Sequence, residues 1–201
     1  MTSTSPDPAR LDAPLPQDAF PRPMETARLC LRVPRAGDEG LCARMLTEAQ
    51  STRPEPLPER LANSFGTFMV EHWRRYGFGF FILDVKDESL PEPAGHLGFK
   101  YIGADPLHWP QSYEAIELGY ALVPKARGRG YATEAGRAAL AAAFAAFDVP
   151  SIRGRCGLDN AASAAVLLRC GMTELPSDDK RRRFEIWRPA YGAPQGQGRK
   201  D

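Results

Sequence analysis

Hydrophobic residues recur at helical spacing in two long stretches of the chain. Residues 59–76 carry a stripe that includes Phe65 and Trp73, and residues 131–147 combine many alanines with large apolar residues on one face. Pro150 follows the second stretch and cannot continue a helix. The pattern therefore predicts two substantial helices, of which the second is the most strongly marked in the sequence.

Shorter stretches alternate between apolar and polar residues, or are rich in aromatic and β-branched residues, and these predict strands. The expected strands span residues 28–33, 78–85, 96–102, 113–123, 151–157 and 183–188. Two shorter helices are expected, one from an Asp38 cap through Met45 and one over residues 160–170, ended by Gly171. This order of elements is typical of an α/β layer fold with a mixed sheet.

Both ends of the chain lack apolar periodicity. We predict a flexible leader over residues 1–24, one folded domain over residues 25–191 and a flexible tail over residues 192–201. With 201 residues, the chain is long enough for a single well-buried core.

Charge and composition exclude several classes of partner. A net charge of +1 provides no overall field for nucleic acid or an anionic membrane, and no apolar run is long enough to span a bilayer. The four cysteines, Cys30, Cys42, Cys156 and Cys170, contain no Cys-x-x-Cys pair and are interpreted as small hydrophobic residues. We expect a cytoplasmic protein without a metal site.

The most informative segment lies between a predicted strand and the helix at residue 131. It reads Arg127-Gly128-Arg129-Gly130-Tyr131-Ala132 and follows Lys125. The glycines permit a tight turn, and the first amides of the helix have no partner inside it. Together with the helix dipole and the cations, these amides suit a phosphate group.

This segment resembles the pyrophosphate loop of the GNAT superfamily of N-acetyltransferases, Gln/Arg-x-x-Gly-x-Gly/Ala. Further similarities are Glu25-Thr-Ala-Arg-Leu-Cys-Leu-Arg32 at the start, Glu117-Leu-Gly-Tyr120 before the loop, and Asn160-x-x-Ser163 followed by Cys170-Gly-Met172. They are most similar to the branch that contains the ribosomal-protein N-terminal acetyltransferases. The resemblance covers residues 25–188.

The resemblance implies a mixed, mostly antiparallel sheet of about six to seven strands, flanked by helices and splayed between strands 4 and 5. Acyl-CoA, most simply acetyl-CoA, would bind in that opening, with its pyrophosphate on the amides of residues 127–132. Asn160 would contact the pantetheine or adenosine part. Backbone donors near Leu122 and Val123 would stabilise the oxyanion.

Two residues are candidates for acid–base chemistry. Glu117 lies among small residues on one face of its strand and is a candidate general base, with a salt bridge or structural hydrogen bond as the alternative. Many GNAT enzymes carry an acid tyrosine where this chain has Leu167, which leaves Ser163 as a weak acid candidate or no acid at all. Asn160 is also an ordinary helix cap.

The expected reaction is direct transfer of an acetyl group to a primary amine in a ternary complex, and a non-catalytic acyl-CoA-binding module is the alternative. The acceptor remains open between a small molecule and a protein N-terminus, as does the choice between monomer and homodimer. We expect the segment 54–76, with Arg60, His72, Arg74 and Arg75 exposed, to form the acceptor side. The run 180–183 is interpreted as a solvated hairpin, and His72, His96 and His108 have no metal-binding spacing.

Overall fold

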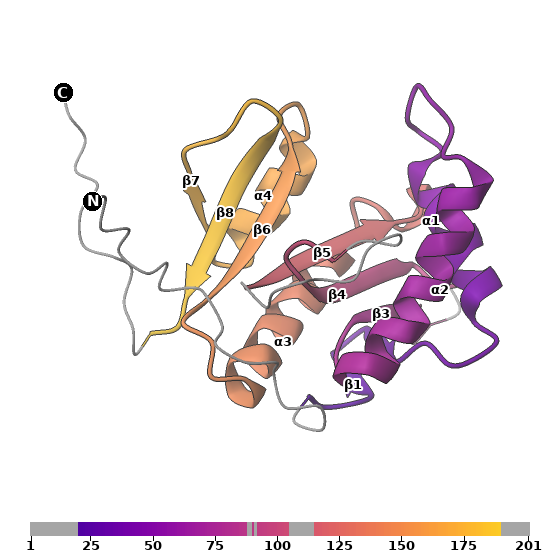
Figure 1. The fold of residues 1–201 in the computed structure, drawn as a ribbon, viewed down its shortest axis with the longest axis horizontal. Coiled ribbons are helices and arrows are strands. Elements are labelled where there is room, and N and C mark those ends of the chain that lie inside the picture. Colours follow the sequence, from indigo (N-terminus) through magenta and orange to yellow (C-terminus); the bar gives the residue numbers. More distant parts are fainter. Residues whose placement is uncertain (1–19, 88–89, 91, 105–114, 190–201) are drawn as a thin grey trace, which may run out of the picture.

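The computed structural model describes residues 20–87, 90, 92–104 and 115–189. Within them, strands form one 8-stranded sheet in the order β1-β2-β3-β4-β5-β6-β8-β7 (Figure 1). The strands are β1 Met24–Glu25, β2 Leu29–Arg32, β3 Phe80–Val85, β4 Gly95–Tyr101, β5 Ile116–Leu122, β6 Ser151–Gly157, β7 Thr173–Leu175 and β8 Arg181–Trp187. The α-helices are α1 Glu39–Gln50, α2 Glu59–Tyr76, α3 Tyr131–Ala146 and α4 Ala161–Arg169.

The sheet is antiparallel except at its centre. There β5 and β6, joined through α3, run parallel and pair only through Glu117 with Arg153 and Leu118 with Gly154. Beyond these residues the carboxyl ends of the two strands diverge, and Figure 1 shows the two parts of the sheet at a wide angle. This confirms the predicted mixed, mostly antiparallel sheet with its opening between the fourth and fifth predicted strands.

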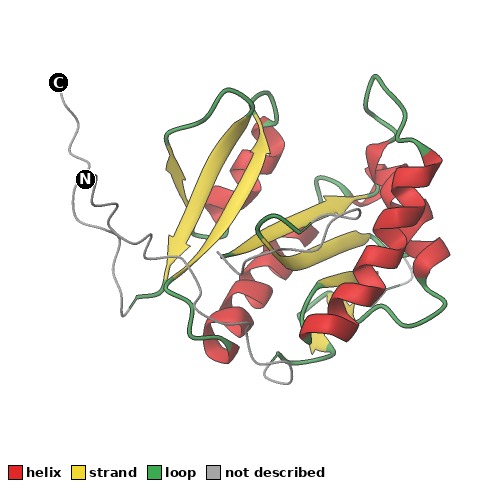
Figure 2. Ribbon diagram, viewed as in Figure 1, coloured by secondary structure: helices red, strands yellow, loops and turns green. Residues whose placement is uncertain are grey.

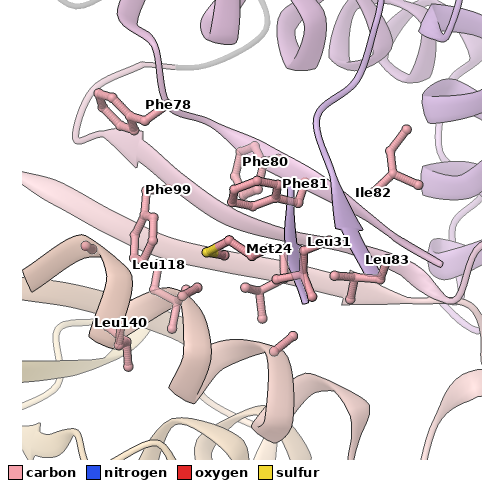
Figure 3. Packing of buried hydrophobic residues seen from close by; sticks show 14 of the residues in the cluster. Met24, Leu31, Phe78, Phe80, Phe81, Ile82, Leu83, Phe99, Leu118 and Leu140 are labelled. Atoms are coloured by element: carbon pink, nitrogen blue, oxygen red, sulfur yellow. The ribbon is translucent and has the colours of Figure 1, made fainter. Parts of the chain in front are cut away.

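Helices cover both faces of the sheet (Figure 2). On one face, the Phe65 ring of α2 packs 4.9 Å from the ring of His96 on β4. On the other face lies α3, and Figure 3 shows Phe99, Leu118 and Leu140 together there, whereas Ile82 points to the opposite side. α4 packs beside α3, where Arg137 donates to the Arg169 carbonyl at 2.9 Å. Both layers therefore bury an apolar face against the central strands.

The core extends further toward the N-terminus than predicted. Phe20 is 2% exposed, and its ring stacks on that of Phe147 with centroids 5.2 Å apart. Met24 is also buried, in β1. The predicted leader of residues 1–24 therefore supplies two core side chains, while residues 1–19 and the tail 192–201 lie outside the described residues.

Most predicted elements are confirmed, with instructive differences at their ends. The bounds predicted for α2 and β6 agree with the structure, but α1 continues five residues past Met45, to Gln50, because Met45 and Ala49 are both buried on its inner face. β1 and β7 were not predicted, since 2 and 3 residues carry no readable alternation. None of the helices in the described part of the chain is long and apolar enough to cross a membrane.

The prediction that His72 is exposed is wrong. Its side chain is fully buried, its Nδ1 donates to the Phe78 carbonyl at 2.7 Å, and burial lowers its pKa to about 4. Trp73, on the same helix, donates to the Phe80 carbonyl at 2.9 Å. α2 thus anchors itself to the sheet through side-chain donors, while Arg60, Arg74 and Arg75 remain exposed as predicted.

Candidate active site

A cleft of about 1370 Å³ lies where β5 and β6 separate. It is lined by the end of β5, the loop before α3, the first turns of α3 and α4, and the end of α1. Because α3 and α4 follow β5 and β6, both helices begin at this opening. Ligands of open α/β sheets commonly bind at such a position, at the carboxyl ends of diverging strands.

The start of α3, directly after the glycine loop, lies in the wall of this cleft. Gly128 and Gly130 have φ values of +74° and +82°, which favour glycine. Gly130 is the N-cap of α3, no side chain caps the helix, and its first bond runs from the Glu134 amide to the Gly130 carbonyl at 3.0 Å. The amides of Tyr131 and the next two residues therefore have no partner within the helix and can bind an anion.

The N-terminus of α4 differs in this respect. The Asn160 side chain accepts a hydrogen bond from the Ser163 amide at 3.0 Å, so the ordinary capping role predicted for Asn160 is present. Of the two helix starts at the opening, the start of α3 is the better anion site.

Two of the predicted cations, Arg127 and Lys125, bind protein groups at the end of α1. Arg127 donates from Nε to the Leu122 carbonyl at 3.1 Å, from Nη1 to Thr52 Oγ1 at 3.0 Å and from Nη2 to the Ala49 carbonyl at 2.6 Å. Its guanidinium therefore links the loop to the end of α1 through hydrogen bonds. Lys125 Nζ lies 3.9 Å from Oε1 of Glu48, which belongs to α1.

The two amides predicted to stabilise an oxyanion have different environments. The Val123 amide donates to the Ala94 carbonyl at 3.0 Å, next to β4. Alternation along an antiparallel strand turns the neighbouring Leu122 amide away from β4, toward the side on which β6 lies. Of the two amides, only that of Leu122 is therefore directed toward the opening.

Glu117 lies at the point where β5 and β6 part. It is 8% exposed, and its Oε2 accepts hydrogen bonds from Arg155 Nε at 2.8 Å and Nη2 at 2.6 Å. It is not one of the cleft-lining residues. The ion pair is the alternative role considered from the sequence, and it bridges β5 to β6.

Tyr120, which the sequence analysis named in a motif but not as a site residue, reaches across the opening. The Tyr120 hydroxyl of β5 lies 2.7 Å from Ser163 Oγ and 3.1 Å from the Ser163 carbonyl oxygen of α4. Burial raises the pKa of Tyr120 to about 12, although its hydrogen bond with Ser163 acts in the opposite direction. Leu167, at the position of the usual acid tyrosine, is 1% exposed and packs near Gly154.

The structure brings most of the predicted site residues to one cleft. Those that line it are Leu122, Arg127, Gly128, Gly130, Tyr131, Ala132, Asn160 and Ser163, whereas Glu117, Val123 and Arg129 do not. Sequence reasoning missed Arg28, Tyr120 and Glu134. It also missed Val166 and Arg169, which helical spacing from Ser163 would have indicated.

No group of three or more metal-binding side chains occurs among residues that the structure describes. His96 is buried between Phe65 and Phe80, and burial lowers its pKa to about 4. His108 lies outside the described residues.

An opening between parallel strands, with an uncapped helix start behind a glycine loop, is the arrangement that the resemblance to the GNAT superfamily implied. Residues 28–173 match the model of the acetyltransferase (GNAT) domain, so the chain belongs to the GNAT acetyltransferase family. Members of this family use acetyl-CoA as the acetyl donor.

Solved structures show the same fold. An acetyltransferase from Agrobacterium tumefaciens is 26% identical, with a TM-score of 0.67 over 83% of this chain and 94% of that one. RimL, a ribosomal L7/L12 alpha-N-protein acetyltransferase in complex with CoA, is 15% identical, with a TM-score of 0.61 over 81% and 95%. Mycobacterium smegmatis RimJ, in complex with CoA-disulfide, is 20% identical, with a TM-score of 0.57 over 79% and 81%. The expected likeness to ribosomal-protein acetyltransferases is confirmed at the level of the fold.

Replacement of Gly130 by valine tests the loop. At a φ of +82° a β-branched residue is strained, so the loop should change shape and CoA affinity should fall at least about tenfold in calorimetric titration. Gly103→Val is the matched control, because Gly103 has a φ of +87°, open space around it and a place outside the cleft. Wild-type affinity in Gly130→Val would remove the loop from the donor site.

Proposed function

We propose that the protein is an N-acetyltransferase that transfers the acetyl group of acetyl-CoA to a primary amine by direct attack in a ternary complex. The observation that carries this proposal is the uncapped start of α3 at the opening between β5 and β6. The Arg127 amide of the predicted range 127–132 already donates to the Pro124 carbonyl at 3.1 Å, so the pyrophosphate binds the amides of residues 128–132. The pantetheine arm extends toward the Leu122 amide. We place the enzyme in the cytoplasm, where acetyl-CoA is available.

The reaction needs a neutral amine, because a protonated amine has no lone pair for attack on the thioester carbon. Glu117 is our candidate for the proton acceptor, directly or through water. Arg155 binds only its Oε2, so this role depends on Oε1. The neutral amine nitrogen then bonds to the carbonyl carbon. The carbon–sulfur bond breaks, CoA leaves as a thiolate, and the nitrogen loses its second proton to water.

Ser163 is our candidate for the group that stabilises the departing thiolate. If Tyr120 donates its proton to Ser163 Oγ, the Ser163 proton is available to the sulfur. With a pKa of about 12, the Tyr120 phenol stays protonated throughout the working pH range and can hold this arrangement. Since a thiol has a pKa of about 8.5, the help that the leaving group needs is small.

The acceptor side involves the end of α1 more directly than α2. Gln50, Thr52 and Arg53 line the cleft, whereas α2 buries His72 and Trp73 against the sheet. We therefore place the acceptor beside residues 50–53. RimL acts, by its description, on a protein N-terminus, and we include protein N-termini among the candidate acceptors at the level of fold analogy.

Incubation with acetyl-CoA and a panel of amines, followed by mass detection, tests the function. The panel contains polyamines, amino acids, aminoglycoside antibiotics and peptides with free N-termini, and at least one should gain an acetyl group. Tight CoA binding without transfer to any of them would favour a non-catalytic acyl-CoA-binding module, for which Leu167 is the sequence argument.

Glu117→Gln should lower kcat about a hundredfold, because a general base is lost, while CoA affinity stays nearly unchanged. The loss should be smaller for amines that are already neutral. Arg155→Met is the control, since it removes the ion pair and keeps the carboxylate. Equal losses in both variants, or a wild-type rate in Glu117→Gln, would make Glu117 structural.

Tyr120→Phe should lower kcat several-fold, with less effect on thioesters of more acidic thiols. Because its raised pKa keeps the phenol neutral below about 12, Tyr120 should add no titrating limb to the pH–rate profile between about pH 6 and 10. A limb in that range that disappears in Tyr120→Phe would contradict the assigned protonation state.

A further inference from the structure

An ion-paired cluster joins the start of α3 to the turn before β2. Glu134, in the first turn of α3, accepts at Oε1 from Thr26 Oγ1 at 2.6 Å and from the Arg28 amide at 2.8 Å. Its Oε2 lies 2.7 Å from Arg28 Nε and 2.6 Å from Arg28 Nη2. Arg28 and Glu134 are separated by 106 positions in the sequence, and both line the cleft.

The same arginine also holds the loop. Arg28 Nη1 donates to the Arg129 carbonyl at 2.9 Å, and the guanidinium lies 4.9 Å from the centre of the Tyr131 ring. Because a peptide unit is planar, a fixed Arg129 carbonyl also fixes the direction of the Gly130 amide. Glycine at position 130 has little conformational preference of its own, so this direction has to be set from outside.

Charge gives the cluster a second effect. Burial alone would raise the pKa of the Glu134 carboxyl, but hydrogen bonds from Thr26 and Arg28 outweigh it and hold the pKa below its usual value. A carboxylate therefore stands in the first turn of the helix that is to bind an anion. The Arg28 guanidinium neutralises it and still reaches the loop, which a single-point cation cannot do.

We propose that Arg28 is a positioning residue of the donor site, which fixes the Arg129–Gly130 peptide and thereby shapes the pyrophosphate loop. This inference rests on the proposed function, since it assumes that the loop binds the pyrophosphate of CoA. All three guanidinium nitrogens of Arg28 have protein partners, so the residue acts through the loop amides.

The test compares Arg28→Met and Arg28→Lys with the wild-type chain. Calorimetry gives the affinity for CoA. Steady-state kinetics with S-acetylpantetheine, which lacks the pyrophosphate, gives a kcat/KM that does not depend on the pyrophosphate loop. Both variants should lose at least about tenfold in CoA affinity, because lysine cannot bond Glu134 and the Arg129 carbonyl together. Their kcat/KM with S-acetylpantetheine should stay at the wild-type value.

Arg32→Met is the matched control, because Arg32 lies in β2 and bonds Asp84 and Asp38 at 2.8 Å each, outside the cleft. It should retain wild-type CoA affinity. Wild-type CoA affinity in Arg28→Lys, or an equal loss with S-acetylpantetheine, would overturn the inference. A wild-type chain that binds no CoA would instead overturn the proposed function, so the two failures are distinguishable.

Discussion

The parting of β5 and β6 is the constraint on which the rest of the site depends. Parallel strands need a crossover, and here α3 provides it, so the strand, loop and helix that meet at the opening are consecutive in the chain. The two strands share only two residue pairs before they diverge. Glu117 and Arg155 hold them together at the base of the opening, and Tyr120 spans it through Ser163.

Two helix starts face this opening, and the residues that precede them decide how each is used. Gly130 has no side chain that can cap α3, whereas Asn160 caps α4 with its own oxygen. The start of α3 therefore favours an anion, whereas the start of α4 has its free amide bonded by its own N-cap side chain. The difference follows from one residue at each N-cap.

Local pattern predicted the long elements well. The helical stripe of α2 and the glycine-containing loop before α3 are local features, and the resemblance to the GNAT family supplied the opening between the strands. The two shortest strands, β1 and β7, depend on pairing with distant residues, and no local signal marks them. Likewise, His72 looks exposed in sequence because its partner, the Phe78 carbonyl, becomes visible only in the folded chain.

Side-chain roles within the site were harder to predict for the same reason. The link from Arg28 to Glu134 joins residues 106 positions apart, and Tyr120 meets Ser163 across 43 positions. Neighbouring amides in a strand point to opposite sides, but which of Leu122 and Val123 faces β4 depends on the register between the two strands. These contacts depend on the geometry of the sheet, which cannot be read from residue types and their spacing in the sequence.

The tie formed by Arg127 has a consequence for recombination between family members. Its guanidinium binds the Ala49 carbonyl and the Thr52 hydroxyl, so the loop before α3 is held against the end of α1, and both segments line the cleft. A chimera that imports α1 and α2 from another member would change the support of the loop as well as that wall of the cleft. The loop and the end of α1 are therefore not separable modules, and a transplant needs the residue at position 127 and the end of α1 from the same parent.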